Sequence, residues 1–310
     1  MTDIRTARAE EIPNLTTLDG SEERNAATAA YLTDLLAKGC TRPEWCFVAE
    51  NGAGKIVGNV VLWTAPGHDV PTDFVLFEAP WDDPELGLRI LRHGFAAARE
   101  LGATELSHML DMPAQAPQFQ TEPDARQAVL TEAGLSVARD GRRFQWLAGS
   151  ALPAQDPRLT WRSIAEIGSE PFIELFEKIL ADTADSLLQA DVRKLGLRGA
   201  AELLLEDMSD MEHEPEWFEL GYDETGSVAA VSLPARNPSF PVIGFVGVSP
   251  DHRGKGYSAS IVARGTQILV ANGATEIRGD CDAGNVAMYK GFERSGYVNF
   301  ADRRAYSGTI

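Results

Sequence analysis

An internal repeat restricts the fold of this chain more than any other feature. The sequence Gly-Ala-Thr-Glu, followed by an aliphatic residue, occurs at 102–106 and again at 273–277. Further matches flank these copies in the same order; the corresponding positions are Gly94 and Gly265, Pro80 and Pro250, and the segments 133–135 and 295–297. Ordered agreement at several places favours duplication over coincidence, so we expect two copies of one fold.

The length of the chain agrees with two domains, because 310 residues are many for one domain of about 150 residues. The segment 148–157 consists mostly of small residues and contains two prolines, which is typical of a linker. We therefore predict one domain over residues 1–150 and a second over residues 158–310.

The net charge of −18 and the low cysteine content exclude several classes of protein. Nucleic-acid binding depends on clustered Lys and Arg, and no apolar run approaches the roughly 20 residues that span a membrane. Cys40, Cys46 and Cys281 lack the spacing of a zinc site or a disulfide framework, so we assign them packing roles and expect no metal. The first residues show no secretion signal, which predicts a cytoplasmic protein.

Both halves contain the same order of predicted elements. Each begins with a short strand, at 4–7 and 159–162, that leads into an acidic, amphipathic helix start, at 10–18 and 166–179. The hairpin and the strand that follow are expected at 45–50, 56–64 and 74–77 in the first half and at 217–222, 228–234 and 242–248 in the second. A long helix, a strand, a short helix and a final strand complete each half. This order predicts an α/β fold of the α+β kind, with a mixed, mostly antiparallel sheet flanked by helices in each half.

A glycine-rich turn follows the strand 242–248 in the second half. It covers residues 249–258, and the next helix is expected from about Ala259 to Ala271. Glycines let the backbone approach a ligand, and the first N–H groups of a helix attract anions at the positive end of its dipole. The turn therefore predicts a pyrophosphate site. The aligned segment of the first half, 79–87, carries carboxylates and a proline, so we expect no phosphate there.

The turn resembles the signature Arg/Gln-x-x-Gly-x-Gly/Ala of the GCN5-related N-acetyltransferase (GNAT) family, through Arg253, Gly256 and, with serine at the last position, Ser258. The resemblance implies two tandem acyl-CoA N-acyltransferase-like domains, of which the second binds acetyl-CoA. It implies that the main-chain N–H groups of six consecutive residues hold the pyrophosphate: Arg253, Gly254, Lys255, Gly256, Tyr257 and Ser258. It also implies that the strand at Val246 to Val248 receives the pantetheine arm.

Two other interpretations of the turn stay open. The pattern Gly254-x-Gly256-x-x-Ala259, with Asp280 about 24 residues after Gly256, also fits a dinucleotide-binding fingerprint. That fold needs its glycine at the strand end, whereas residues 249–253 intervene here, and few residues remain for further strand-helix units. A glycine turn that binds no ligand is the other alternative.

A second motif follows the strand 276–282 and resembles the family pattern Asn-x-x-Ala-x-x-x-Tyr-x-x-x-Gly-Phe. Asn285, Met288, Gly296 and Tyr297 fall on its positions, with Met for Ala and Tyr for Phe. The resemblance implies that Asn285 contacts the cofactor arm. An asparagine at this place also serves as a helix cap, which does not exclude the first role.

The resemblance implies a cofactor-contacting position at Phe292, where many family members carry a tyrosine that protonates the CoA thiolate. Phenylalanine cannot donate a proton. Tyr289 lies three residues earlier on the same helix and is the candidate acid. A water, or departure of the thiolate without an acid, is the alternative.

A general base is needed only to remove a proton from the acceptor ammonium. Many relatives carry a glutamate in the central strand, whereas this chain has Ile243, Gly244 and Phe245 there. The acidic segment 206–219 borders the acceptor cleft in the family layout, so Glu219 and Glu216 are the candidate bases, and a solvated loop is the alternative.

Four further side chains near these motifs have less specific expected roles. Asp280 and Asp282, at the end of the next strand, are second candidates for the base. We expect His213 and His252 at the surface.

These residues predict an acetyl-CoA-dependent N-acetyltransferase that transfers an acetyl group to the amine of a small, cationic acceptor by direct attack. The partner is then a small molecule, and the protein a monomer or a homodimer. The tandem arrangement is also similar to that of mycothiol synthase. A non-catalytic acyl-CoA-binding module is the alternative, since the tyrosine and the strand glutamate are missing.

Overall fold

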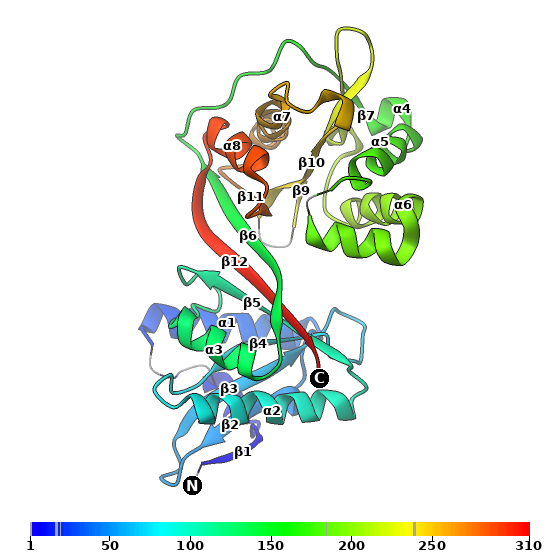
Figure 1. The fold of residues 1–310 in the computed structure, drawn as a ribbon. Coiled ribbons are helices and arrows are strands. Elements are labelled where there is room, and N and C mark those ends of the chain that lie inside the picture. The colour runs from blue at the N-terminus through cyan, green and yellow to red at the C-terminus, as the bar shows by residue number, and fades with distance from the viewer. Residues whose placement is uncertain (1, 16–17, 19, 184, 238–239) are drawn as a thin grey trace. The chain divides into compact units, whose positions relative to one another are not determined.

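The computed structural model describes residues 2–15, 18, 20–183, 185–237 and 240–310, and Figure 1 labels their elements. The chain forms two compact units: unit 1 contains Met1–Asp140 and Arg303–Ile310, and unit 2 contains Gly141–Asp302. Two strands, β6 (Ser136–Leu147) and β12 (Val298–Thr309), continue from one unit into the other. The first boundary therefore falls inside β6, ahead of the expected linker 148–157, and the last residues return to unit 1.

Unit 1 contains a mixed sheet with neighbours in the order β1-β2-β3-β4-β5. The pairs β1–β2, β2–β3 and β3–β4 are antiparallel, and β4–β5 is parallel. The strands are β1 (Asp3–Thr6), β2 (Cys46–Glu50), β3 (Ile56–Trp63), β4 (Asp73–Glu78) and β5 (Glu105–Met112). The helices are α1 (Glu22–Ala37), α2 (Pro84–Glu100) and α3 (Pro123–Glu132), with 3-10 turns at Ile12–Asn14 and Pro43–Trp45. The hairpin β2–β3 and the strand β4 lie where the sequence predicted them.

The helix expected at 10–18 is wrong in its position. The described residues there form a 3-10 turn at Ile12–Asn14, and α1 begins at Glu22. Pro13 lacks a backbone N–H, whereas the side chain of Ser21 accepts a hydrogen bond from the N–H of Arg24 at 3.1 Å and so caps α1. Residues 16–17 and 19 lie outside the described part of the chain.

Unit 2 repeats this layout with the neighbour order β6-β11-β10-β9-β8-β7. β10 and β11 are parallel, whereas β7–β8, β8–β9, β9–β10 and β6–β11 are antiparallel. The strands are β7 (Thr160–Ser163), β8 (Glu219–Tyr222), β9 (Val228–Arg236), β10 (Pro241–Val248) and β11 (Glu276–Asp282). The mixed, mostly antiparallel sheet predicted for each half is thus confirmed.

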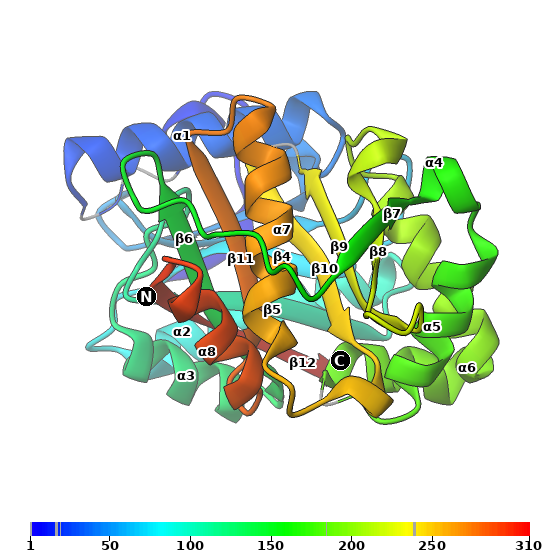
Figure 2. The ribbon, with the colours of Figure 1, turned by 90° about the horizontal axis from the view of Figure 1, so that it is seen from above.

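Helices cover both faces of the unit 2 sheet (Figure 2). They are α4 (Ile164–Ile167), α5 (Glu170–Leu180), α6 (Ser186–Ser209), α7 (Tyr257–Ala271) and α8 (Val286–Arg294). Gly265 of α7 lies so close to β10 that a Cβ on it would come within 2.9 Å of Ile243. A Cβ on Gly244 or Gly247 would instead meet Met208 of α6 or Ile179 of α5. α7 therefore packs on one face of β10, and α5 and α6 pack on the other.

The three cysteines are buried, in agreement with a packing role. Burial raises the pKa of the Cys46 thiol to about 12, so it stays protonated. No helix in the described part of the chain has both the length and the apolar character needed to cross a membrane.

Candidate functional site

The parallel strands β10 and β11 separate soon after they begin. Within the described residues they share one bridge, between Val242 and Arg278, although both strands continue for several residues. Gly244 is exposed in the middle of β10, and Val246 and Val248 are partly exposed, which is unusual for a strand with neighbours on both sides. Main-chain groups on this edge of β10 beyond Val242 are therefore available to an extended ligand between the strands.

The glycine-rich turn leads from the end of β10 into α7. A 3-10 turn at Pro250–His252 comes first, and α7 begins at Tyr257, two residues earlier than expected. Gly254 and Gly256 have φ angles of 78° and 84°, and a Cβ on either would meet no described heavy atom within 4 Å. Both glycines therefore adopt a conformation that other residues avoid, and open space lies beside them.

The start of α7 presents backbone donors rather than a side-chain cap. Gly256 is the N-cap residue, and no side chain of the described residues caps this helix end. The first N–H groups of a helix have no carbonyl partner inside it, and the helix dipole adds positive potential there. Residues 253–256 are exposed. The turn thus fits the pyrophosphate of a cofactor such as acetyl-CoA, and its exposed donors and open space are the observations that support this fit.

Two residues outside the sequence motifs hold this turn. Asp182, just after α5, accepts a hydrogen bond from Arg253 at 2.5 Å. Arg158, just before β7, donates to the carbonyl of Lys255 at 2.9 Å. Neither lies in a motif or a periodic pattern, so only the folded chain brings them to the turn.

Three candidate residues in or next to α8, Asn285, Tyr289 and Phe292, have defined contacts. Asn285 caps the helix, since its Oδ1 accepts a hydrogen bond from the N–H of Met288 at 3.2 Å. Phe292 is buried, with its ring stacked on that of Phe144 at a centroid distance of 4.6 Å. Tyr289 is partly exposed and meets the same Phe144 ring edge-on at 5.2 Å. Phe292 and Tyr289 thus project from the same side of α8.

The two candidate bases lie in different surroundings. Glu219 is buried at the start of β8, and both its oxygens accept hydrogen bonds from Arg264 of α7, at 2.5 and 2.7 Å. This bond raises the pKa of the Arg264 guanidinium. Glu216 lies in the 3-10 turn Pro215–Trp217 and is exposed. Glu219 is therefore part of a buried ion pair, and Glu216 is open to solvent.

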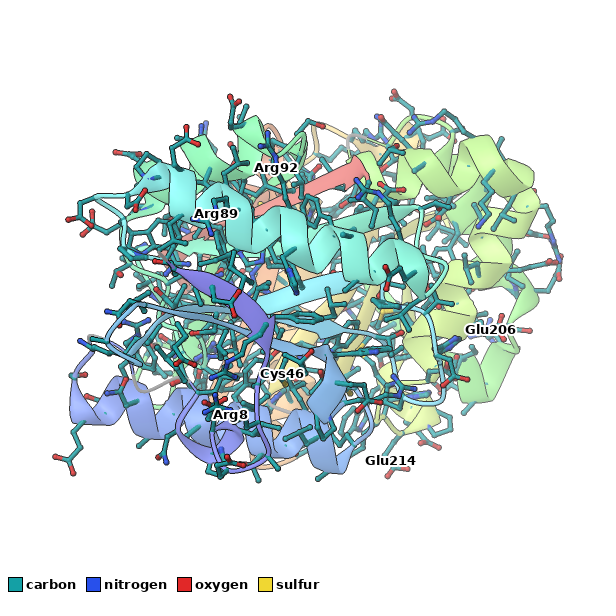
Figure 3. All side chains as sticks on the ribbon, turned by 90° about the horizontal axis from the view of Figure 1, so that it is seen from below. Arg8, Cys46, Arg89, Arg92, Glu206 and Glu214 are labelled. Carbon is teal, nitrogen blue, oxygen red and sulfur yellow. The ribbon has the colours of Figure 1, made fainter. Side chains whose placement is uncertain are left out.

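The rest of the acidic segment is partly helical. Residues up to Ser209 belong to the last turns of α6, and Glu206 and Glu214 are at the surface (Figure 3). Burial, aided by the neighbouring carboxylates of Asp191 and Asp210, raises the pKa of Asp207. Of the second candidates, Asp280 is exposed and Asp282 is partly exposed at the end of β11.

The surface position expected for His252 is wrong, and His213 is only partly exposed. His252 is buried, and its Nε2 lies 3.0 Å from Oδ2 of Asp223 in the β8–β9 turn. His213 is partly buried because its ring stacks on Phe218 at a centroid distance of 4.0 Å. Hydrophobic contact and a carboxylate partner, neither visible in the local sequence, draw these rings inward.

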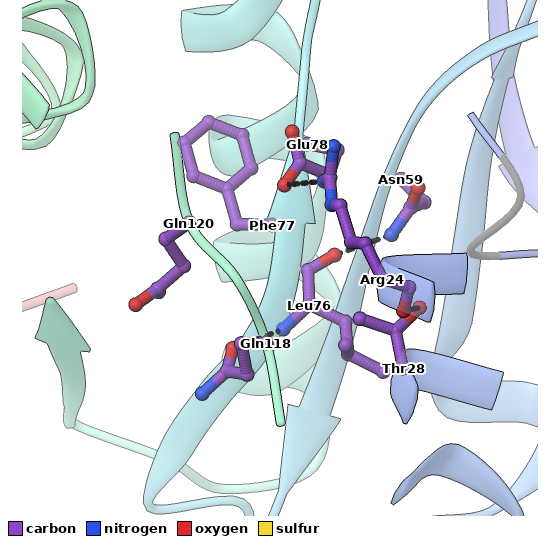
Figure 4. Close-up of a pocket in the computed structure, with 8 residues that line it drawn as sticks. All are labelled: Arg24, Thr28, Asn59, Leu76, Phe77, Glu78, Gln118 and Gln120. Atoms are coloured by element: carbon purple, nitrogen blue, oxygen red, sulfur yellow. Dashed lines mark hydrogen bonds and ion pairs between the residues drawn. The ribbon is translucent and has the colours of Figure 1, made fainter. Parts of the chain in front are cut away.

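Unit 1 has the same strand divergence but fills it with its own chain. Within the described residues, β4 and β5 share one bridge, between Asp73 and Ser107. The side chain of Gln118 accepts a hydrogen bond from the N–H of Leu76 on β4 at 2.8 Å (Figure 4). Gln120 donates to the carbonyl of Met109 on β5 at 2.9 Å. The loop after β5 therefore takes up the backbone groups that a ligand would use.

A buried histidine helps to hold this loop between β4 and β5. Gln120 also donates to Nε2 of His108, which leaves Nδ1–H of the ring to donate to the carbonyl of Phe74 at 2.9 Å. Burial lowers the pKa of His108 to about 4, so the ring is neutral. The small cavity that remains is lined by eight residues: Arg24, Thr28, Asn59, Leu76, Phe77, Glu78, Gln118 and Gln120.

The first turn of α2 is also less open to a ligand than the first turn of α7. Asp83 caps α2 by accepting a hydrogen bond from the N–H of Leu86 at 3.1 Å. Glu78, at the end of β4, pairs with Arg24 and Arg126. A carboxylate thus stands at the start of α2, whereas the backbone donors at the start of α7 are open, and the unit 1 turn is a poor anion site.

Comparison with known proteins gives a family match within unit 2 and similar folds among solved structures. The model of the acetyltransferase (GNAT) family matches residues 184–297, a segment that contains the glycine turn and α8. This segment of unit 2 is therefore similar to the acetyltransferase (GNAT) family. A search of curated proteins found no match.

Solved structures share the fold at low sequence identity. A GCN5-related N-acetyltransferase from Sphaerobacter thermophilus aligns with a TM-score of 0.63 and 13% identity, over 99% of this chain and 95% of that one. A glucosamine N-acetyltransferase region of a fungal multi-domain GH3 β-N-acetylglucosaminidase aligns with a TM-score of 0.56 and 15% identity, over 99% of this chain and 38% of that one. The chain thus has the fold of GCN5-related N-acetyltransferases along its length.

Proposed function

We propose that the protein is an N-acetyltransferase that uses acetyl-CoA at one site, in unit 2, and acetylates the amine of a small, cationic acceptor. The observation that carries the proposal is the uncapped, glycine-rich start of α7 beside the diverging strands β10 and β11. Both features lie within the segment that matches the family model. Unit 1, with a capped α2 and a filled divergence, is proposed to bind no cofactor.

Each part of the site has a proposed task. Main-chain N–H groups from Arg253 to Ser258 hold the pyrophosphate, and Val246 and Val248 on the open edge of β10 align the pantetheine arm. Asn285 and Phe292 support the far wall. When bound, acetyl-CoA supplies an acetyl group activated as a thioester.

We assign proton transfer to side chains that solvent can reach. We propose Glu216, rather than Glu219, as the residue that accepts the ammonium proton through water, because Arg264 occupies both oxygens of Glu219. Tyr289 is the proposed acid for the departing thiolate, since its ring is partly exposed on the side of α8 that also carries Phe292. The acidic residues near the end of α6 favour a cationic acceptor.

Calorimetric titration of the purified protein with acetyl-CoA, with NADH in parallel, tests the cofactor and the number of sites. We expect saturation at one acetyl-CoA per chain and no heat from NADH. Two acetyl-CoA per chain would contradict the assignment of unit 1. Binding of NADH alone would favour the dinucleotide interpretation of the turn.

A pair of glycine variants tests the place of the site. Gly256 and Gly273 lie at opposite ends of α7 with the same φ of 84°, and each has open space around a Cβ. A leucine at either position costs similar backbone strain, on the order of 1–2 kcal/mol. At Gly256 it also displaces the pyrophosphate from several charge-assisted hydrogen bonds, so Gly256→Leu should weaken acetyl-CoA binding by about a hundredfold or more. Gly273→Leu should bind normally, and equal effects of the two variants would place the cofactor elsewhere.

The alternative of a non-catalytic acyl-CoA-binding module is distinguished by turnover. A binding module saturates with acetyl-CoA but transfers no acetyl group to any amine in a panel that includes polyamines, amino sugars and aminoacyl compounds. Release of free CoA that depends on one of these amines would establish the enzyme.

A further inference from the structure

In the turn at the start of α7, the local sequence does not fix the orientation of the peptide unit between Lys255 and Gly256. Gly256, on the C-terminal side of this peptide, and Gly254, the residue before Lys255, have positive φ, and no described atom lies within 4 Å of a Cβ at either position. Glycine accepts both signs of φ almost equally, so local sterics do not decide which way this peptide faces. A contact from outside the turn must decide it.

That contact comes from the segment between β6 and β7. Nη1 of Arg158 donates to the carbonyl oxygen of Lys255 at 2.9 Å. The guanidinium also lies over the ring of Tyr257, with Cζ 4.7 Å from the ring centre. Arg158 thus contacts the residues on both sides of Gly256.

The guanidinium is itself held in place by Asp156. Oδ1 of Asp156 accepts hydrogen bonds from the backbone N–H and Nε of Arg158 at 3.0 and 2.9 Å, and Oδ2 accepts one from Nη2 at 2.6 Å. Oδ2 also accepts the hydroxyl hydrogen of Ser260, in the first turns of α7, at 2.5 Å. Asp156 is largely buried, with its side chain 12% exposed, whereas that of Arg158 is 51% exposed. The pair is therefore anchored to the helix whose first turn it orients.

A peptide unit is planar and trans, so its C=O and N–H point in opposite directions. Because Arg158 holds the Lys255 carbonyl on the side of the segment 150–159, the N–H of Gly256 points away from that segment. We infer that Arg158, braced by Asp156, is a positioning residue that turns the Gly256 N–H toward the pyrophosphate. The inference rests on the proposed function, because it assigns a partner to that N–H.

The role differs from a direct charge contact with the cofactor. The positive charge of Arg158 is already paired with Asp156, and Nε, Nη1 and Nη2 each donate a hydrogen bond to Asp156 or to the Lys255 carbonyl. Loss of Arg158 therefore removes orientation rather than attraction. A lysine has the same charge but lacks the planar fork that reaches both partners at once.

Calorimetric titration of Arg158→Ala and Arg158→Lys with CoA and with dephospho-CoA, which lacks the 3′-phosphate, tests the inference. We expect both variants to bind both ligands about tenfold more weakly, as loss of one well-oriented hydrogen bond predicts. KM for acetyl-CoA should rise in the same proportion, with kcat and KM for the amine unchanged. Arg162→Ala is the matched control, because Arg162 is also an exposed arginine of unit 2 but pairs with Glu166.

Each other outcome has a definite meaning. A loss of affinity confined to CoA would show that Arg158 contacts the 3′-phosphate and would overturn the positioning role, as would full affinity of Arg158→Lys. Wild-type affinity in Arg158→Ala would do the same while leaving the proposed function intact. If the wild type binds neither ligand, the proposed function fails and the inference fails with it. Melting temperatures within a few degrees of wild type check that each variant is folded.

Discussion

The ring of Phe292 lies flat against Phe144 and is almost completely buried. Its tip faces β11 so closely that a Cβ on Gly279 would come within 2.8 Å of its Cζ. The residue therefore supports the wall between α8 and β11, and the glycine on β11 is what makes room for the ring. The partly exposed Tyr289, on the same side of α8, is better placed for contact with a ligand.

One variant that adds a hydroxyl group and one that removes a hydroxyl group distinguish the structural role of Phe292 from the proposed catalytic role of Tyr289. Phe292→Tyr places a hydroxyl against the backbone of β11, and an unsatisfied buried hydroxyl costs about 1–3 kcal/mol, so the melting temperature should fall with no gain in turnover. Tyr289→Phe should leave the melting temperature unchanged and lower kcat if the hydroxyl protonates the thiolate. Thermal unfolding and steady-state rates of both variants are the measurements. A rise in kcat for Phe292→Tyr would instead return the acid to that position.

At the scale of elements, the ion pair of Glu219 and Arg264 ties β8 to α7, the helix that carries the proposed cofactor site. Breaking a buried pair leaves one charge uncompensated, so Glu219→Leu should lower the free energy of unfolding by about 3 kcal/mol. The double variant Glu219→Leu/Arg264→Met removes both charges and should recover most of that loss. Denaturant unfolding and turnover are measured together. If Glu219 were the base, the double variant would be stable and yet inactive, which would contradict the structural role.

The elements that the sequence predicted well are those marked by local signals. Glycines and alternating apolar residues located the hairpins, β10 and the turn before α7, because these signals act within a few residues. The helix expected at 10–18 failed because an acidic, apolar pattern does not reveal that the cap lies at Ser21. Arg158 and His252 were missed or misplaced for another reason. Their partners, Lys255 and Asp223, are determined by the tertiary fold.

For the whole molecule, the repeat predicted two copies of one fold, and both units show the same diverging parallel pair. The division of the chain was less accessible to sequence reasoning. A proline-containing segment at 148–157 looks like a boundary, but the boundary drawn by packing lies within β6, and residues 303–310 pack in unit 1. A strand that continues from one unit into the other does so because its side chains enter both cores, and local composition does not reveal this.

The end of β12 provides a test of that division. Tyr306 is fully buried in the core of unit 1, and its hydroxyl donates to Gln127 at 3.2 Å. Tyr306→Ala should destabilise unit 1 by about 4 kcal/mol, the cost of removing a large buried ring. Tyr297→Ala is the matched control, because Tyr297 is buried in the core of unit 2 and lies a few residues earlier in the chain.

Hydrogen exchange read by mass spectrometry, with acetyl-CoA titration alongside, separates the two variants. Tyr306→Ala should speed exchange in peptides from residues 1–140 and leave acetyl-CoA affinity unchanged, since the proposed site belongs to unit 2. Tyr297→Ala should speed exchange in peptides from residues 141–302 and weaken acetyl-CoA binding, because its hydroxyl bonds to Thr266 of α7 at 2.7 Å. Equal acceleration in both sets of peptides by either variant would mean that the two units unfold as one, and that the last residues of the chain stabilise the cofactor site as much as they stabilise unit 1.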